Sequence, residues 1–546
     1  MTTPVLLSQR CGPGHVRSVG GGYGPALRAA VARGFVGVAL LTSSGCMVGP
    51  NYTRPAAATN AVWMEAEHEG VQATAAPTDH WWDAFGDPVL SRLVETAYAQ
   101  NLTLRVAGLR VIEAQARRSI TIGNLFPQQQ ELTGSYTRMR VGTNGPTPAF
   151  FGRDFNAWQA GFDAAWELDV WGKFRRAIEA ADADLLGAVA NYDDVLVSLV
   201  AEVAATYVQL RVLDERLTVA RDNVRLQQDG LAIARVRFEA GGTSELDVHQ
   251  ATTLLRDTEA TIPQLEIQQR QAVDGLSVLL GRPPSELEDV LGAPGRAPAA
   301  PATVMVGIPA DLLRRRPDVR RAERAAAAQS ARIGVAYAEL LPAFQLIGSV
   351  GLEAKDVANL FEGNSFTATT GPAFNWPVLN YGRLISNVRL QDATFQELAV
   401  DYANAVLVAQ REVEDALIGA LRGNEQVQRL AESVAAANRA VEISLVQYRQ
   451  GAVDFTSVLN TQQAKLREDD LLVSTRGAVA LSVIALYKAL GGGWAIGDGQ
   501  DFVPDDTRAE MRARTEWGNQ LAPAARTRDV EDAQPDGAGG RWWPKW

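Results

Sequence analysis

The sequence predicts a mostly α-helical protein with a small β part, in which a long coiled-coil helical hairpin occurs twice. The segment 156–176 reads NAWQAGFDAAWELDVWGKFRR and alternates apolar and polar residues until a helical pattern begins after Gly172. Alternation with a period of two is typical of a strand with one apolar and one polar face. A second copy of this junction lies at 371–383, where Gly382 matches Gly172 at an offset of 210 residues. The same strand-to-helix unit is therefore present twice.

Both copies lead into an unusually long helical pattern. No proline occurs between Gly172 and Ala240, a stretch that measures about 100 Å as a helix at 1.5 Å per residue. Apolar residues recur there every seven positions, which predicts coiled-coil packing with a left-handed supercoil. These residues are Leu196, Val203, Leu210, Leu217, Val224, Leu231 and Phe238, with Val406, Val413, Ala420, Val427, Val434, Val441 and Tyr448 in the second copy.

Glycines end each long helix and predict a tight reversal into a returning helix. Gly241 and Gly451 occupy equivalent turns, and Gly281 and Gly491 follow the returning helices. Before the long helices, Asp87 and Pro88 begin a helix expected to continue to about Asn124. We therefore divide the chain into an export signal (1–45), a tether (46–86), a first repeat (87–282), an insert (283–312), a second repeat (313–494) and a partly disordered tail (495–546).

Four strands are expected, at 131–141 and 156–170 in the first repeat and at 344–352 and 366–379 in the second. Their length suits a membrane-spanning strand, but four strands cannot close a barrel and open edges are not tolerated in lipid. Three chains would supply twelve strands around an aqueous pore. The polar face would then line the lumen with Asp163, Glu167 and Asp169, and the apolar face would meet lipid with Trp158, Phe162, Trp166, Phe374 and Trp376.

The N-terminal region has the pattern of an export signal. Basic residues precede a short apolar segment at 34–42, and small residues at 43–45 precede Cys46. The pattern resembles a bacterial lipoprotein signal, in which Cys46 becomes the lipidated first residue, although Ser43 stands where such signals usually carry leucine. The alternative is an ordinary cleaved signal with a free thiol. No later segment has about eighteen consecutive apolar residues, so no transmembrane helix is predicted.

Composition argues against several other functions. The net charge of −11 argues against nucleic acid as a partner. The four histidines are scattered and there are two cysteines, Cys11 and Cys46, so neither a metal cluster nor a disulfide framework is predicted. No nucleophile–base pair or phosphate-binding loop stands out. We therefore expect neither an enzyme nor a bound cofactor.

Several motifs, in this order on a duplicated frame, resemble the outer membrane factor family. This family comprises the TolC-type trimeric ducts of Gram-negative efflux and secretion systems, and the match is to its lipoprotein branch in RND-type efflux. The motifs are CMVGPNYTRP from Cys46, WWDAFGDPVL from Trp81, WELDVWGKFRR from Trp166, LLRRRPDVRRAE from Leu312, WPVLNYGR from Trp376 and QYRQGAVDFTSVLN from Gln447. The resemblance implies a homotrimer with a twelve-stranded outer-membrane β-barrel, a periplasmic α-barrel and an equatorial belt from 285–309 and part of the tail.

The resemblance also implies working residues at the two hairpin turns. In family members these turns meet a periplasmic adaptor that connects to an inner-membrane transporter, here through Gly241, Gly242, Gly451 and Ala452. The same ends narrow the pore, and the positions that match are Tyr448, Arg449, Asp454 and Asn460. Asp247, just past the first turn, is a further candidate for the gate, and the alternative is that it pairs with a neighbour. Asn460 departs from the family, where aspartate is frequent. The alternative is that these residues are helix caps and solvated surface groups.

The resemblance implies an exit duct that passively conducts small molecules for an efflux system. A duct for type I protein secretion is a second interpretation. A periplasmic coiled-coil adaptor or scaffold is a third, which the amphipathic strands argue against because a scaffold would not need them.

Overall fold

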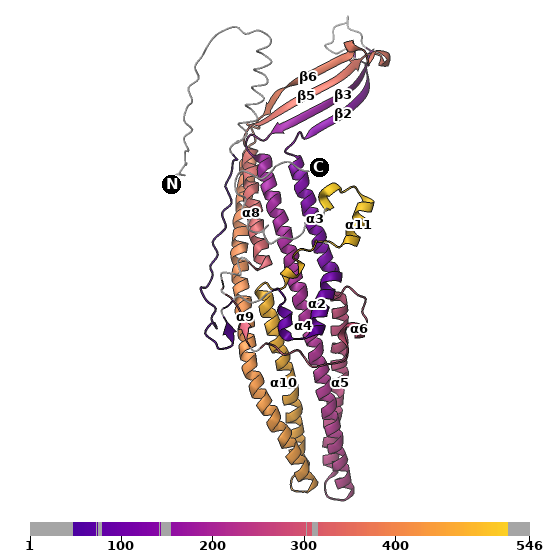
Figure 1. Cartoon of the computed structure of the whole chain (residues 1–546), viewed down its shortest axis with the longest axis vertical. Helices are drawn as coiled ribbons and strands as arrows, with labels where there is room; N and C mark the ends of the chain where they lie inside the picture. Colours follow the sequence, from indigo (N-terminus) through magenta and orange to yellow (C-terminus); the bar gives the residue numbers. More distant parts are fainter. Residues whose placement is uncertain are drawn as a thin grey trace.

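The computed structural model describes residues 47–521 except 73, 75–78, 141, 143–153, 302, 308 and 310–314. The protein is elongated, with helices along its long axis, a four-stranded sheet at one end and two hairpin turns at the other (Figure 1). The predicted signal at 1–45, the lipidation site Cys46 and the tail beyond residue 521 lie outside the described residues.

The long axis is set by two helical hairpins. Helices α4 (Lys173–Glu239) and α9 (Arg383–Arg449) each have 67 residues, and the returning helices α5 (Glu245–Leu279) and α10 (Phe455–Ala489) each have 35. The offset of 210 residues holds at both ends of all four helices. The glycine that follows each long helix has a positive φ, 70° for Gly241 and 76° for Gly451. The duplication predicted from the sequence is therefore present in the fold.

Most heptad positions are buried, as the coiled-coil pattern predicts. Leu196, Val203, Val406 and Val413 are at most 1% exposed. The last position differs between the repeats, because Tyr448 is 1% exposed whereas the equivalent Phe238 is 42% exposed. Helices α4 and α10 each contain an apolar window long enough to cross a membrane by composition, but most of each window is buried inside the helical body. Their apolar residues are accounted for by this core.

The returning helices cover only the half of α4 and α9 that lies far from the sheet. Helices α3 (Leu102–Gly123) and α8 (Pro317–Ala338) pack beside the other half (Figure 1). The sequence predicted one helix from 87 to 124, and this was wrong: α2 (Pro88–Gln100) and α3 are separate. Asn101 between them is extended, and its side chain accepts a hydrogen bond from Leu104 N and donates one to the Leu279 carbonyl. A cap residue thus ends one helix and starts the next.

The sheet contains β2 (Gln129–Arg140), β3 (Asp154–Leu168), β5 (Ala343–Ala354) and β6 (Phe366–Asn375), with short 3₁₀ turns at Val357–Asn359 and Gly363–Ser365 before β6. The order is β2-β3-β5-β6 and all pairs are antiparallel. The expected fourth strand reached residue 379, but β6 ends at Asn375 because Pro377 lacks the N–H that a ladder needs.

A belt of short elements surrounds the middle of the helical body. The tether and the insert meet through a parallel pair, β1 (Val71–Gln72) with β4 (Val304–Met305). The belt also contains η1 (Trp81–Phe85), α6 (Glu288–Leu291), η5 (Trp494–Gly497), α11 (Asp505–Arg514) and η6 (Gly518–Leu521). Met511 and Leu521 pack against Ile112 of α3. The tail that the sequence analysis expected to be partly disordered is therefore folded as far as residue 521.

Candidate functional site

Over its central rows the sheet separates apolar from polar side chains in all four strands, whereas at the end of β2 Arg138 with Asn156 and Arg140 with Asp154 lie on the same face as Tyr136. Directly paired residues share a face, and Leu132, Phe162, Val350 and Ala368 form one such row. The same face carries Tyr136, Trp158, Trp166, Leu346, Phe366 and Phe374. The opposite face carries Glu131, Thr133, Asp163, Glu167, Gln345, Glu353 and Thr369.

The residues that the structure describes leave much of the apolar face uncovered. Leu132 is 87% exposed and Phe374 is 71% exposed. Water-soluble proteins rarely expose a continuous apolar surface of this kind. The alternation predicted from the sequence therefore extends across all four strands in the central rows, and its apolar side requires an apolar environment.

Two residues that the sequence assigned to the strand faces lie beyond the strand ends. Asp169 follows β3, and its carboxylate accepts hydrogen bonds from the backbone N–H groups of Phe174 (3.0 Å) and Arg175 (3.1 Å). It also forms an ion pair of 2.9 Å with the Arg175 side chain. Asp169 therefore fixes the start of α4 rather than extending the polar face. Trp376 follows β6 and lies outside the sheet in the same way.

Two of the three tryptophans predicted to face lipid make equivalent contacts. The indole of Trp166 donates a hydrogen bond to the Leu125 carbonyl at 3.1 Å, and that of Trp376 donates one to the Leu340 carbonyl at 3.0 Å. Each carbonyl lies just after the helix that leads into the sheet, α3 or α8. The two indoles therefore tie the sheet to the helical body at matching places in the two repeats.

At the opposite end, one arginine connects the two hairpin turns. The guanidinium of Arg237, on α4, lies 4.6 Å from the centre of the Tyr448 ring on α9. It donates hydrogen bonds to the Tyr448 carbonyl and, at 3.0 Å, to the Gly242 carbonyl. A cation above an aromatic ring adds electrostatic attraction to these bonds. Arg237 therefore holds the end of α9 against the first turn.

The hydroxyl of Tyr448 makes a second link between the hairpins. It donates a hydrogen bond of 3.0 Å to the Asp247 carboxylate on α5, which also accepts one from the Thr243 hydroxyl. Burial raises the pKa of Tyr448, and the bond to Asp247 adds to this effect, although the Thr243 contact opposes it. The phenol therefore stays protonated and remains a donor at neutral pH.

An apolar cluster lies behind these polar contacts. The Tyr448 ring meets the edge of Phe455 with their centres 5.4 Å apart. Leu231, Ala234, Ala251, Leu255 and Val458 complete the cluster, in which all four helices of the two hairpins take part. The turns are thus joined by a small core as well as by hydrogen bonds.

The structure brings together only two of the five residues proposed to narrow the pore. Tyr448 and Asp247 are in contact, whereas Arg449, Asp454 and Asn460 are exposed at or near the same tip. The turn residues Gly241, Gly242, Gly451 and Ala452 are exposed as well.

Sequence reasoning missed Arg237 and Thr243. The repeat gave no signal for Arg237, because Gln447 occupies its equivalent position. Its place directly before the heptad residue Phe238 was the available indication.

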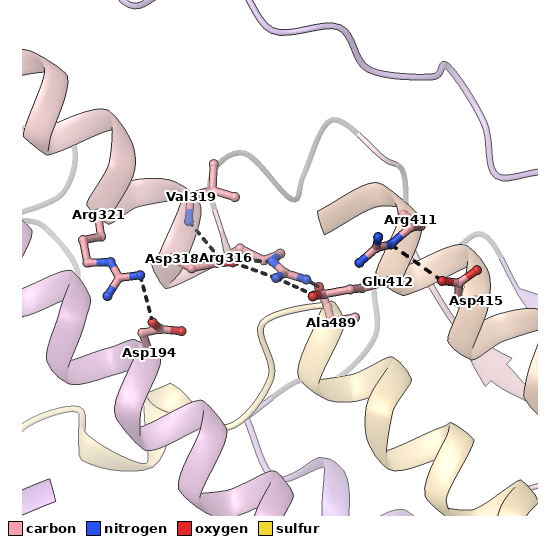
Figure 2. A network of polar contacts seen from close by, with 9 residues as sticks. All are labelled: Asp194, Arg316, Asp318, Val319, Arg321, Arg411, Glu412, Asp415 and Ala489. Carbon is pink, nitrogen blue, oxygen red and sulfur yellow. Dashed lines mark hydrogen bonds and ion pairs between the residues drawn. The ribbon is translucent and has the colours of Figure 1, made fainter. Parts of the chain in front are cut away.

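Arg316, Asp318 and Arg321, in the described part of the motif LLRRRPDVRRAE, belong to an ionic network at the equator in which Arg316 is buried (Figure 2). Arg316 pairs with Asp318 and Glu412, each at 2.7 Å, and donates to the Ala489 carbonyl at 2.9 Å. Arg321 pairs with Asp194 on α4 at 3.6 Å. The start of α8 is thereby joined to α4, α9 and α10.

The pKa of Asp318 reflects this environment. Burial alone would raise it, but the hydrogen bond and the charge of Arg316 outweigh burial and lower the pKa below its usual value. Asp318 therefore stays ionised beside a permanently charged arginine.

The sequence matches a known protein family over most of both repeats. The family described as "Outer membrane efflux protein" matches residues 93–282 and 308–492, which are most of the two repeats. The chain belongs to the outer membrane efflux protein family. The resemblance read from the motifs is therefore confirmed, and the protein is an outer-membrane efflux channel component.

Individual relatives of this outer membrane efflux protein agree. The pyoverdine export outer membrane protein OpmQ of Pseudomonas putida is 33% identical over 426 residues, covering 78% of this chain and 90% of that protein. The solvent efflux pump outer membrane protein SrpC of Pseudomonas putida is 32% identical, covering 84% and 97%. The solved outer-membrane channel OprN is 31% identical with a TM-score of 0.78, covering 82% of this chain and all of that one. The TolC-type fold is thus confirmed.

Proposed function

We propose that three copies of this chain form one continuous duct that passively conducts small molecules through the outer membrane, with no catalytic step of its own. The observation that carries the proposal is the sheet, in which four strands separate apolar from polar side chains while β2 and β6 each pair with a single described strand. Four strands need further strands to close in lipid. Three chains give twelve strands, enough for a water-filled lumen.

The polarity of the two faces indicates which face of the sheet points outward in the closed barrel. With the apolar face outward, Trp158, Phe162 and Phe374 meet lipid. Asp163 and Glu167 then face the aqueous interior. The helical body continues from the inner end of the sheet for about 100 Å, the length of 67 residues at 1.5 Å each. Such a body reaches far into the periplasm.

The hairpin turns are the surface proposed for partners. They form the end farthest from the sheet (Figure 1), where a periplasmic adaptor and, through it, an inner-membrane RND-type transporter would connect. Gly241, Gly242, Gly451 and Ala452 are exposed there. A short turn with exposed backbone lets a partner helix approach closely.

The contacts among Arg237, Tyr448 and Asp247 are proposed to hold the tip in its closed arrangement. They bind the two hairpins of one chain to each other. Arg449, Asp454 and Asn460 are exposed beside them and would face neighbouring chains across the pore. Opening then requires that these bonds break before the hairpins move apart.

The segment after Cys46 supports a lipid anchor at that residue. Val48 N donates a hydrogen bond to the Trp171 carbonyl at 3.1 Å, where the sheet meets the helices. Arg176, which is buried, donates to the Val48 carbonyl and, at 2.7 Å, to the Asn51 side chain. Residues next to Cys46 are thus fixed at the level where the barrel would enter the membrane, which is where an acyl chain can insert.

Small-molecule efflux is favoured over protein secretion. The relatives are named for pyoverdine export and for solvent and toluene efflux. A periplasmic scaffold no longer fits, since the relatives are outer-membrane proteins.

Purified protein reconstituted in a planar bilayer tests the proposal. We expect detergent-dependent trimers that give discrete conductance steps. Material that is monomeric and soluble without detergent would overturn it.

A further inference from the structure

The two junctions between a strand and a long helix are equivalent in sequence but differently covered. Trp171, after β3, donates from its indole to the Pro342 carbonyl at 2.8 Å, directly before the neighbouring strand β5. Tyr381 holds the same place after β6 and is 99% exposed. Its φ of 50° lies in the left-handed region, which a tyrosine rarely adopts. Trp171 thus has an adjacent strand to pack on, whereas Tyr381 lies at the open edge of the sheet.

The repeat relates each strand of the first half to one of the second. Because Gly382 follows Gly172 by 210 residues, β6 is the copy of β3 and Pro372 corresponds to Phe162. Phe162 pairs with Leu132, and Pro372 pairs with Leu346. Leu346 therefore corresponds to Leu132, which makes β5 the copy of β2 at an offset of 214 residues.

We propose that β6 of one chain pairs with β2 of the next in the register already present between β3 and β5. Within the chain Phe162 faces Val350, whose copy in β2 is Tyr136. Pro372 then faces Tyr136 of the neighbouring chain, and Asn375 faces Thr133. This inference rests on the proposed assembly of three chains, and it specifies which residues of β6 and β2 pair between neighbouring chains.

The arrangement also gives Tyr381 its missing surroundings. Trp171 lies against the residues that lead into β5. The corresponding residues before β2 are at 127–128, in the neighbouring chain. Tyr381 would pack there, so the uncovered aromatic of each chain closes the junction of the next.

The faces of the sheet restrict the choice of register. A shift by one residue would place the apolar side chains of β6 among the polar ones of β2, because successive side chains point to opposite faces. A shift by two residues keeps every side chain on its own face, so the registers displaced by two are the alternatives to the proposed one. In the proposed register Phe374 faces Gly134, whereas a shift by two sets it against Leu132 or Tyr136. An aromatic ring over a strand glycine is a favourable cross-strand pair.

Engineered cysteine pairs in the full-length protein, kept in its membrane, test the register. The matched pairs are Thr133→Cys with Asn375→Cys on the polar face and Gly134→Cys with Phe374→Cys on the apolar face. Neighbouring pairs alternate between hydrogen-bonded and non-hydrogen-bonded positions, so the two cover both geometries. The controls, Thr133→Cys with Ala373→Cys and Ser135→Cys with Asn375→Cys, are displaced by two residues.

Directly opposed Cβ atoms lie about 5 Å apart and diagonal ones about 7–8 Å, while a disulfide needs roughly 4 Å. We therefore expect at least one matched pair to form roughly tenfold more intermolecular disulfide than either control on non-reducing gels. Native mass measurement reports assembly separately. Trimers that link better through a control pair, or through neither matched pair, would overturn the register while leaving the duct intact. A monomeric chain would overturn the assembly itself.

Discussion

The hydroxyl of Tyr448 donates a hydrogen bond to the Asp247 carboxylate at 3.0 Å. The two residues are 201 positions apart in the sequence, and their contact joins the two hairpins. Tyr448 is buried, and Arg237 covers its ring. The tip of the helical body is therefore held by one residue that makes a polar, a cationic and an apolar contact. Removal of its hydroxyl alone tests the polar contact.

Tyr448→Phe should loosen the closed tip without disturbing the fold. It removes the hydroxyl and keeps the ring that contacts Arg237 and Phe455. A hydrogen bond to a charged group contributes about 1.5–3 kcal/mol, so the open fraction should rise roughly tenfold to a hundredfold. Single-channel recording measures this. Ser244→Ala removes a hydroxyl from the same tip and should leave the open fraction unchanged; equal behaviour of the two variants would contradict the role of Tyr448.

Arg449→Ala and Asp454→Ala should also raise conductance, through contacts between chains. Both side chains are exposed in the single chain, so their effect depends on neighbours in the trimer. The same bilayer recordings apply. If neither variant changes the conductance, these two residues do not belong to the gate.

The closed tip should be insensitive to pH until the solution becomes strongly alkaline. Burial raises the pKa of Tyr448, so the folded tip favours the protonated phenol. The protonated phenol of Tyr448 therefore contributes fully to the stability of the closed tip below the pKa of an unfolded tyrosine, about 10. This contribution is lost as the pH rises through the higher pKa of the folded state. Conductance measured from pH 7 to pH 11 should increase only above about 10. Tyr448→Phe should abolish this increase, and an alkaline transition that persists in the variant would assign it to another group.

Arg316→Leu should destabilise the equator far more than a neighbouring surface change. Arg316 is buried and pairs with Asp318 and Glu412 (Figure 2), so its loss leaves carboxylates uncompensated. Breaking a fully buried pair lowers stability by about 3–5 kcal/mol, and since the side chains of Asp318 and Glu412 are 27% and 44% exposed, solvation offsets part of this loss. The matched control is Arg411→Ala.

The control removes an ion pair with Asp415 whose side chains are 67% and 73% exposed. Such a pair contributes at most about 1 kcal/mol. Thermal unfolding in detergent compares the two variants, and an equal decrease in melting temperature would refute the structural role of the network.

Cys46→Ser should prevent incorporation of labelled fatty acid. The residues that follow Cys46 are fixed beside Trp171 by Val48 and Arg176, so the trimer should still form and conduct. Metabolic labelling followed by gel analysis gives the result. Label that persists in the variant would refute the anchor at this residue.

Periodic features of the fold could be predicted from the sequence. Alternation identified the strands and their two faces, and the heptad with its glycine stops located all four hairpin helices. The helix break at Asn101 could not be seen, because its cause is a bond to the distant Leu279 carbonyl. Part of the tail was expected in the equatorial belt, but its bounds could not be predicted, since Met511 and Leu521 are ordered by packing on the distant α3.

The tip shows the same division. Tyr448 was chosen by its position in the motif that begins at Gln447 and Asp247 by its place just past the first turn, and the structure brings the two into contact. Arg237 depends on three-dimensional proximity to Tyr448, and no periodic pattern marks it. Local patterns thus predict elements, while single long-range contacts require the structure.

Helices α4 and α9 have identical lengths, and so do α5 and α10. The two turns of each chain therefore end at one level, and six turns in a trimer would form an even crown. Adding seven residues to each helix of one hairpin would displace three of the six turns along the long axis by about 10 Å, at 1.5 Å per residue. A partner that binds the other three turns could then no longer contact all six in the same way. An insertion or deletion in the hairpin of one repeat should consequently be accompanied by one of equal length in the other repeat, so that all six turns stay at one level.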